Sequence, residues 1–149
     1  AEPLLLHGLV NKAGLEQAIR ELMDNVGLAR AFVRKYPHEF SGGQRQRIAI
    51  GRALATRPEF IVADEPVSAL DVTIQAQILD LLADLTKEYG LTMLFISHDL
   101  AVIRQIADRI AVMYLGKLVE EGATAQVFET PQQDYTRSLL GAIPGANAA

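Results

Sequence analysis

The stretch FIVADEP, residues 60–66, is a short apolar run that ends in two acids and a proline. An uninterrupted run of this length predicts a strand buried on both faces, here Phe60 to Ala63. The stretch LTMLFIS, residues 91–97, predicts a second strand of the same kind. A long helix is expected between them. It ends at Gly90, and its apolar face consists of Ile74, Ile78, Leu81, Leu82 and Leu85. This order of elements indicates an α/β fold with a parallel sheet.

The segments on either side of these strands differ in kind. Residues 100–107 read as a helix, and RIAVMYLG and KLVEEG then read as two strands around Gly116. We expect the first of these to extend the parallel sheet. Two short helices are expected around 124–128 and 135–142. Before Phe60 the chain is expected to be almost wholly helical, with helices at 15–26 and 42–56. The predicted divisions are a helical subdomain (1–57), part of an α/β core (58–118) and a C-terminal extension (119–149).

Composition excludes several classes of protein. Of the 149 residues, half are hydrophobic, so the chain can bury a core and is not a disordered tail. The net charge of -4 does not favour a nucleic-acid partner or an anionic membrane. The absence of cysteine excludes disulfides and thiolate metal sites. With no long apolar run and no basic leader, the expectation is a soluble, cytoplasmic chain.

Two adjacent carboxylates follow the first predicted strand. In an open parallel sheet, ligands bind beyond the carboxyl ends of the strands. The side chains of Asp64 and Glu65 are expected to point to opposite faces of the sheet. Pro66 is expected to hold the backbone of Glu65 extended. Such a pair suits metal-assisted phosphate chemistry, in which one acid helps to hold Mg²⁺ and the other takes a proton from water. The alternative is a strand that simply becomes polar where it meets solvent.

The stretch HEFSGGQRQRIAIGRAL, residues 38–54, opens a helix with Ser41, Gly42, Gly43 and Gln44. One interpretation is a capping box between Ser41 and Gln44, which by itself needs no glycines. The other is that the glycines let backbone N–H groups approach a phosphate at the positive end of the helix. Local sequence does not decide between them. The arginines at 45, 47 and 52 are interpreted as structural.

Two further stretches are ambiguous when taken alone. SALD, residues 68–71, is explained by a turn in which Asp71 caps the following helix. FISHD, residues 95–99, places His98 just beyond the second strand, where a single histidine is usually structural. The predicted topology would nevertheless bring His98 close to Glu65.

Together and in this order, the four stretches resemble the ATP-binding-cassette (ABC) ATPases, over essentially the whole chain. FSGGQRQR is similar to the family signature, FIVADEP to the Walker B strand, SALD to the D-loop and FISHD to the H-loop. The resemblance implies a P-loop NTPase-like fold that binds ATP and Mg²⁺. It implies that Asp64 supports Mg²⁺, mainly through water, that Glu65 is the general base, and that His98 contacts the γ-phosphate. Ser41, Gly42, Gly43 and Gln44 would contact the γ-phosphate of a nucleotide held by a partner subunit, and Ser68 and Asp71 would belong to the D-loop.

The tail PQQDYTRSLLGAIP is similar to the ATPase subunits of bacterial oligopeptide, dipeptide, glutathione and nickel importers. Gln133 and Asp134 stand where those proteins have His-Pro. Phe40 replaces the commoner leucine before the signature serine, and Val67 replaces a frequent threonine. The resemblance therefore implies a peptide-type importer without specifying its solute.

The phosphate loop that a cassette ATPase needs, G-x-x-x-x-G-K-[ST], is absent from the sequence. Gly116-Lys117 is the only Gly-Lys pair, and it lacks the rest of the pattern. The expectation is therefore the C-terminal portion of a longer ATPase. Alone, that portion should neither bind MgATP appreciably nor hydrolyse it.

The favoured function is the ATP-hydrolysing subunit of a bacterial importer, energised by ATP-driven dimerisation. The expected partners are a second ABC ATPase subunit, identical or not, permease subunits and, indirectly, a solute-binding protein. The expected location is the inner face of the cell membrane. The alternatives are a translation or DNA-repair ATPase, which the acidic balance and Ser68-Ala69 disfavour, and an inactive regulatory fragment, which the intact acids and His98 disfavour.

Overall fold

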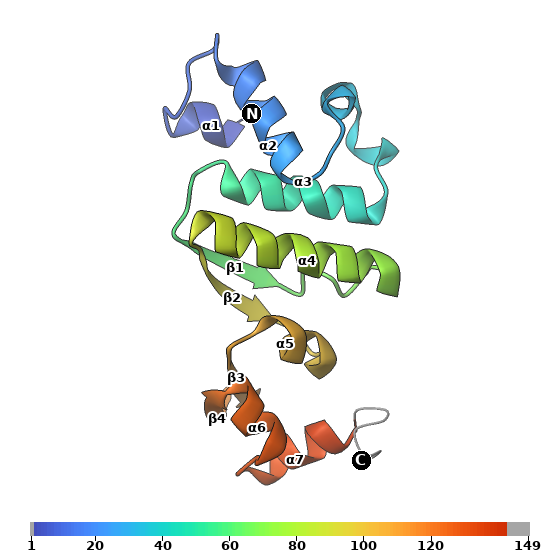
Figure 1. The fold of residues 1–149 in the computed structure, drawn as a ribbon, viewed down its shortest axis with the longest axis vertical. Helices are drawn as coiled ribbons and strands as arrows, with labels where there is room; N and C mark the ends of the chain where they lie inside the picture. The colour runs from blue at the N-terminus through green and yellow to red at the C-terminus, as the bar shows by residue number, and fades with distance from the viewer. Residues whose placement is uncertain (1, 143–149) are drawn as a thin grey trace. The chain divides into compact units, whose positions relative to one another are not determined.

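The computed structural model describes residues 2–142, which form two compact units that divide between Leu94 and Phe95. Figure 1 shows the order of the elements along the chain. The divisions at residues 57 and 118 that we predicted remain predictions. Residue 1 and the end of the importer-like tail, residues 143–149, lie outside the described part.

The first unit begins with helices, as predicted. Its leading elements are α1 (Glu2–Leu6), α2 (Leu15–Asn25), the 3₁₀ helices η1 (Arg30–Arg34) and η2 (Pro37–Glu39), and α3 (Gly42–Leu54). The short helix α1 was not predicted. Gly27, with φ 65°, follows α2 at the stop that the sequence indicated. Val26 and Leu28 are buried there, at the start of the unit's core.

The long predicted helix is α4 (Val72–Tyr89), which packs along α3 (Figure 1). It buries four residues and ends at Gly90, which takes a left-handed φ of 62°; the buried residues are Ile78, Leu79, Leu82 and Leu85. Asp71 caps its start, because the carboxylate accepts a hydrogen bond from Ile74 N at 3.0 Å. The apolar period and both end signals therefore placed this helix correctly.

The two predicted strands are β1 (Phe60–Asp64) and β2 (Thr92–Ile96), which pair in a two-stranded parallel sheet. Thr92 N donates to Glu59 O at 2.9 Å at the entrance to this pair. The prediction that the strands are buried on both faces is wrong for the described residues: Phe60 is 53% exposed and Val62 56%. Two strands alone present too little surface to cover each other's side chains.

The third predicted strand does not extend that sheet. Among residues 2–142, β3 (Arg109–Tyr114) pairs only with β4 (Lys117–Ala123), and the pairing is antiparallel. Leu115 and Gly116 join the two strands, with φ values of 46° and 74°. Positive φ at both loop residues is the geometry of a tight hairpin that follows the natural strand twist. A two-residue connection can join only antiparallel neighbours, so this local turn decides the pairing.

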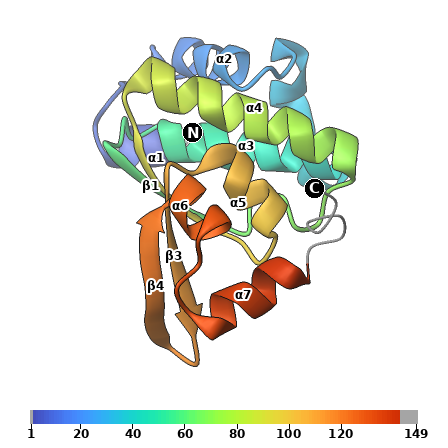
Figure 2. The same ribbon diagram turned by 60° about the horizontal axis from the view of Figure 1, so that its bottom comes forward.

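Three helices pack on this hairpin in the second unit: α5 (Leu100–Ile106), α6 (Thr124–Glu129) and α7 (Asp134–Gly141) (Figure 2). Their small core contains Ile103, Ile110, Val112 and Val127. The Glu120 carboxylate accepts hydrogen bonds from the backbone N–H groups of Gln132 (2.8 Å) and Gln133 (3.1 Å). These two bonds fasten the segment that leads into α7. No helix within residues 2–142 has the length and apolarity to cross a membrane.

Candidate functional site

The first turn of α3 is closed by a complete capping box. Ser41 has the extended backbone of an N-cap residue, and its Oγ accepts a hydrogen bond from Gln44 N at 3.3 Å. In return, Gln44 Oε1 accepts from Ser41 N at 3.2 Å. The capping interpretation is therefore confirmed. It does not compete with anion binding, because a hydroxyl oxygen that accepts one bond still has its hydrogen to donate.

Gly43 has a packing role that the sequence analysis did not identify. It is buried, and a Cβ atom at this position would lie 2.5 Å from Ile74 Cγ2 on α4. Gly42 is more open, since its Cβ would meet only the end of the Leu70 side chain, at 3.3 Å. The start of α3 therefore approaches Leu70 and the start of α4 more closely than a residue with a side chain allows. A sequence shows the glycine but not the distant residue that excludes a side chain.

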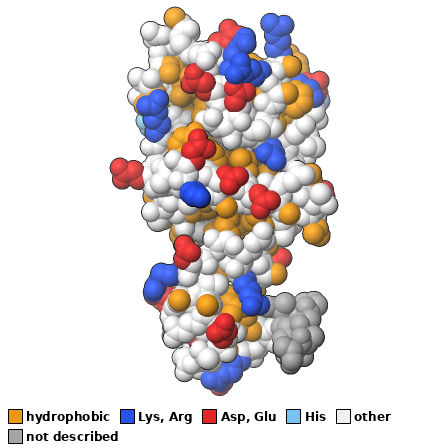
Figure 3. All heavy atoms as spheres, in the orientation of Figure 1, with side chains coloured by type: hydrophobic (Ala, Val, Ile, Leu, Met, Phe, Trp, Pro, Cys, Tyr) orange, Lys and Arg blue, Asp and Glu red, His pale blue; other side chains and the backbone are white. Residues whose placement is uncertain are grey.

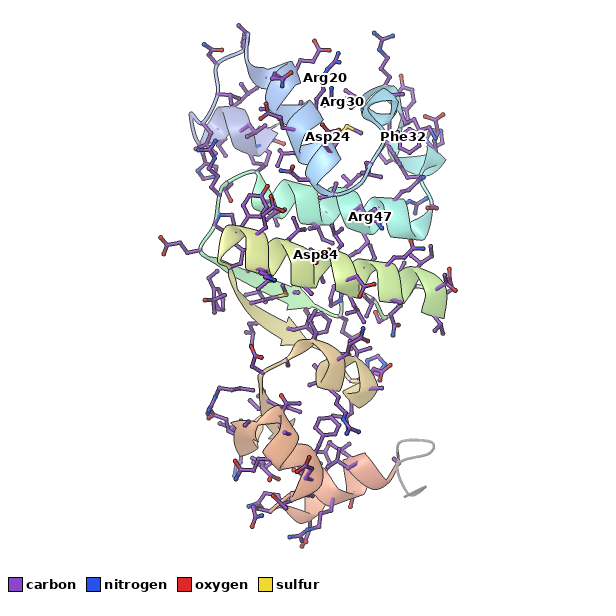
Figure 4. The ribbon with its side chains drawn as sticks, in the orientation of Figure 1. Arg20, Asp24, Arg30, Phe32, Arg47 and Asp84 are labelled. Atoms are coloured by element: carbon purple, nitrogen blue, oxygen red, sulfur yellow. The ribbon has the colours of Figure 1, made fainter. Side chains whose placement is uncertain are left out.

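Two of the α3 arginines bind backbone carbonyl groups, as their structural interpretation required. Arg45 Nε donates to Phe40 O at 3.1 Å. Arg47 Nη1 donates to Val26 O at 2.8 Å, at the end of α2 (Arg47 is labelled in Figure 4). The carboxyl end of a helix carries unpaired carbonyl groups and partial negative charge, so a guanidinium is well placed there.

The acids after β1 lie at a sharp turn. Asp64 is the last residue of the strand and is exposed. Glu65 has φ 45°, so the prediction that Pro66 holds it extended is wrong. Proline disfavours only the right-handed helical region for the residue before it, and Glu65 avoids that region by taking a left-handed conformation. Its carbonyl accepts hydrogen bonds from Ser68 N (3.4 Å) and Ser68 Oγ (3.1 Å), which close the turn.

Ser68 and Asp71 are thus part of the local architecture of this turn and of α4. Ser68 holds the carbonyl of Glu65, and Asp71 caps α4. The structural interpretation of SALD is confirmed, and the D-loop role of Ser68 and Asp71 remains a prediction. Hydrogen bonds within the first unit therefore hold the start of α3, the turn after β1 and the start of α4.

His98 follows β2 and is exposed. Around it, Ser97 Oγ accepts from Asp99 N at 3.0 Å, and the Asp99 carboxylate caps α5 by accepting from Ala101 N at 2.9 Å. The histidine belongs to the second unit, whereas Ser41–Gln44, Asp64 and Glu65 belong to the first. The predicted proximity of His98 and Glu65 therefore remains a prediction.

Comparison with known proteins connects these motifs. Residues 7–68 match the family described as ABC transporter. The chain is 57% identical over 145 residues to the oligopeptide transport ATP-binding protein OppF of Bacillus subtilis, covering 97% of this chain and 48% of that protein. It is 55% identical to OppF of Streptococcus mutans, covering 97% and 47%. The chain belongs to the ABC transporter family.

A third ABC relative is the glutathione import ATP-binding protein GsiA of Pectobacterium atrosepticum. It is 53% identical over 146 residues, which cover 98% of this chain and 23% of that protein. The chain therefore spans about half the length of the OppF relatives and about a quarter of the GsiA relative. Its helices and partial parallel sheet are consistent with part of an ABC cassette.

Proposed function

We propose that this chain supplies the signature, Walker B, D-loop and H-loop portion of an ATP-hydrolysing subunit that energises the import of peptides or similar small solutes. The observation on which the proposal mainly depends is the start of α3. There Ser41 and Gly42 are exposed at the positive end of a 13-residue helix, and the Ser41 hydroxyl keeps its hydrogen for an acceptor. Relatives named for oligopeptide transport and glutathione import support the solute class.

In this proposal the start of α3 recognises the γ-phosphate of an ATP bound mainly by a second ABC subunit. Ser41 donates its hydroxyl hydrogen, and the backbone N–H groups of Gly42 and Gly43 add donors along the helix dipole. Gln44 holds Ser41 in place through the capping box. Closure of the two subunits around ATP would then depend on these residues. Reopening of the dimer would depend on hydrolysis of the ATP.

The residues after β1 and β2 perform the hydrolytic step in this proposal. Glu65 accepts a proton from the attacking water, and its exposed position after the strand leaves room for one. His98 contacts the γ-phosphate and orients it. The turn held by Ser68 fixes the backbone of Glu65, which would keep the base in one place during turnover.

A magnesium ion would be held by Asp64 through water. Within residues 2–142, no group of three or more His, Asp or Glu side chains gathers as a complete metal site. That fits Mg²⁺, which keeps several waters and is usually bound by one or two carboxylates together with the substrate phosphates. When bound, the ion would neutralise charge on the phosphates.

The proposed partners are a second ABC subunit, identical or not, and permease subunits that place the ATPase on the cytoplasmic face of the membrane. A solute-binding protein would act with them indirectly. No nucleic-acid partner is proposed, in keeping with the net charge of -4.

A hybrid protein tests the proposal. This chain would replace the matching half of OppF in Bacillus subtilis, and uptake of a labelled oligopeptide and ATP hydrolysis by the purified hybrid would be measured. We expect the hybrid to restore both. The Glu65→Gln variant should lose hydrolysis by about 10²-fold or more while still binding ATP, because a general base typically contributes 10²–10⁴-fold.

The control variant is Glu129→Gln, which changes an acid at the end of α6, far from the motifs in the sequence. It should leave uptake and hydrolysis unchanged. A well-folded hybrid in which Glu65→Gln kept normal turnover would refute the catalytic role. Micromolar binding of MgATP by the chain alone, measured by calorimetry, would refute the expectation that it supplies only part of the nucleotide site.

A further inference from the structure

The start of α3 rests on two side chains from the segment around the start of α4. A Cβ atom on Gly42 would lie 3.3 Å from Leu70 Cδ2, and one on Gly43 would lie 2.5 Å from Ile74 Cγ2. Both contacts lie within the first unit, where α3 and α4 run side by side (Figure 1). Ser41 directly precedes these two glycines, so its position depends on how closely α3 approaches α4.

Gly43 faces the interior of the unit. It is buried, and the three atoms nearest to its missing Cβ all belong to Ile74. Because carbon atoms in contact normally lie about 3.5–4.0 Å apart, a side chain at position 43 would push the helices roughly 1 Å apart. Ser41 and Gly42, in contrast, are exposed. Gly43 therefore sets the closest approach of the two helices, whatever it does for a phosphate.

Ile74 is itself held firmly by the cap of α4. The Asp71 carboxylate accepts a hydrogen bond from Ile74 N at 3.0 Å, and Asp71 O accepts one from Gln75 N at 2.8 Å. A β-branched side chain in a helix also has one strongly preferred χ1 rotamer. The Cγ2 methyl group of Ile74 is therefore a stiff stop on a capped turn.

The rest of α3 is anchored independently of Ile74. Arg47 Nη1 donates to Val26 O at 2.8 Å, and Ile50 and Leu54 are buried further along the helix. Figure 3 shows hydrophobic side chains between the charged ones over α3 and α4. A change in the contact between Gly43 and Ile74 is therefore expected to displace mainly the first turn of α3, which contains the groups proposed to contact ATP.

We propose that Ile74 is a positioning residue, whose Cγ2 methyl group stops α3 at the distance that places Ser41 for the γ-phosphate. The inference rests on the proposed function and adds to it a residue that acts on Ser41 and not on the nucleotide. It also gives the Asp71 cap a second effect, because the hydrogen bond that starts α4 holds the stop in place.

Moving a methyl group from one helix to the other tests the proposal in the hybrid with OppF. Gly43→Ala should lower ATP turnover by about 10- to 100-fold, since a misplacement of about 1 Å can cost 10²-fold. Ile74→Leu removes the branch at Cβ and can leave the Cγ2 position empty. The double variant Gly43→Ala/Ile74→Leu should therefore recover to within about threefold of the native hybrid.

Two conservative variants serve as controls. Ile74→Val keeps the Cγ2 methyl group, so its turnover should stay within about twofold of the native value. Ile78→Val removes the same amount of apolar volume one turn further along α4, and its turnover should also stay within about twofold although the core is destabilised.

The affinity of the hybrid for ADP separates positioning from misfolding. ADP lacks the γ-phosphate that Ser41 is proposed to contact. Its dissociation constant should therefore be unchanged in Gly43→Ala, while ATP turnover falls. A variant that had merely lost its fold would lose ADP binding as well.

NMR of the chain alone provides a measurement that does not depend on ATP. In isotope-labelled chain, the amide signals of Ser41 and Gly42 should shift in Gly43→Ala and return toward their native positions when Ile74→Leu is added. The signal of Gly90, at the other end of α4, should not move. A native hybrid without ATP hydrolysis would refute the proposed function, whereas these signals would still decide whether Ile74 positions Ser41.

Four results would overturn the inference. The first is normal turnover of Gly43→Ala. The second is a loss that persists unchanged in both the Ile74→Leu and the Ile74→Ala backgrounds, because the added methyl group would then obstruct something other than Ile74. The third is an equal loss in Ile78→Val, which would show general destabilisation. The fourth is an unchanged Ser41 signal in Gly43→Ala.

Discussion

The start of α3 and strand β1 lie in the same unit but depend on very different surroundings. In the first turn of α3, Ser41 and Gln44 form two reciprocal hydrogen bonds, and Gly43 packs closely against Ile74. In the sheet, Phe60 and Val62 leave more than half of their surface exposed. The helix start is thus completed by residues within the unit. The strands have formed their hydrogen-bonded pair without comparable coverage of their side chains.

This contrast separates two ways in which a sequence specifies structure. A cap or a close helix contact involves a few atoms, and the chain already supplies all of them. A parallel sheet buries its strands only when further layers cover them. Stability should therefore be concentrated in the contact between α3 and α4, and substitutions in the exposed part of the sheet should have small effects.

The largest expected effect is that of Ile78→Ala. Ile78 is fully buried on α4, so its truncation should lower the free energy of unfolding by about 2–5 kcal/mol through lost burial and a cavity. Val62→Ala, on β1, should cost less than about 1 kcal/mol. Urea denaturation of both variants measures the difference. Equal losses would show that β1 is as well packed as α4 and would remove the contrast.

The second-largest loss of stability is expected for Gly43→Ala. Alanine improves helix propensity by roughly 0.5–1 kcal/mol, but a Cβ 2.5 Å from a β-branched side chain forces α3 and α4 apart at about 1–3 kcal/mol. A net loss of stability is expected. Gly42→Ala is the matched control, because its Cβ meets only the flexible end of Leu70.

The Ile74→Ala background distinguishes this clash from other causes. If the contact with Ile74 is responsible, Gly43→Ala should cost clearly less there than in the native chain, and a double-mutant cycle measures the coupling. An undiminished cost would mean that Gly43 is needed for a different reason.

The cap of α3 should make a smaller contribution. Ser41→Ala removes the acceptor for Gln44 N and should reduce stability by about 1 kcal/mol. Ser41→Asp keeps an oxygen in the capping position. Its free energy of unfolding should therefore lie within a few tenths of a kcal/mol of the native value. If both variants lose equal stability, the capping box contributes nothing measurable. Thermal or urea unfolding provides the measurement.

The smallest effect is expected in the second unit and depends on pH. The pKa of Glu120 is lowered, first by the N–H of Gln132 and also by the N–H of Gln133. Its carboxylate therefore stabilises the fold above the unfolded-state pKa, about 4.5, and this contribution disappears as the pH falls through the lower folded-state value. The thermal midpoint of Glu120→Gln should lie below that of the native chain at pH 7, and the gap should narrow and then close as the pH falls below 4.5.

Glu121, the neighbouring acid, provides a control for the loss of a negative charge without the loss of the two backbone hydrogen bonds. Glu121 pairs with Arg109 at 2.8 Å on the exposed side of the hairpin, and such surface pairs contribute little. Glu121→Gln should therefore have a smaller effect at pH 7. A pH-independent gap for Glu120→Gln would show that its carboxylate does not fasten the segment before α7.

The sequence predicted features that depend on nearby residues. The apolar period of α4, its Asp71 cap and its Gly90 stop are all local signals, and the capping box at Ser41 is another. Features that depend on distant residues were missed or wrong. The exposure of Phe60 depends on how many strands the sheet has, and the need for glycine at position 43 depends on Ile74, which lies on another helix.

Two further errors come from turns. The sequence suggested an extended Glu65, but Glu65 has a positive φ at the start of the turn that Ser68 closes, and proline after it permits that conformation. The sequence also suggested that β3 joins the parallel sheet. Leu115 and Gly116, which both have positive φ, instead form a tight turn that pairs β3 with β4. The roles of Asp64, Glu65, His98 and Ser41–Gln44 are a matter of chemistry with a nucleotide, so only biochemical measurements test them.

The hydrogen bond from Arg47 to Val26 O joins the middle of α3 to the end of α2. Gly51 also faces Val26 across the two helices, where a Cβ would already lie 3.4 Å from Cγ1. With so little clearance, α2 cannot tilt far without taking α3 with it. A change in the position of α2 is therefore expected to move α3, and with it Ser41 at the start of that helix. The contact between α2 and α3 thus couples the position of α2 to that of Ser41.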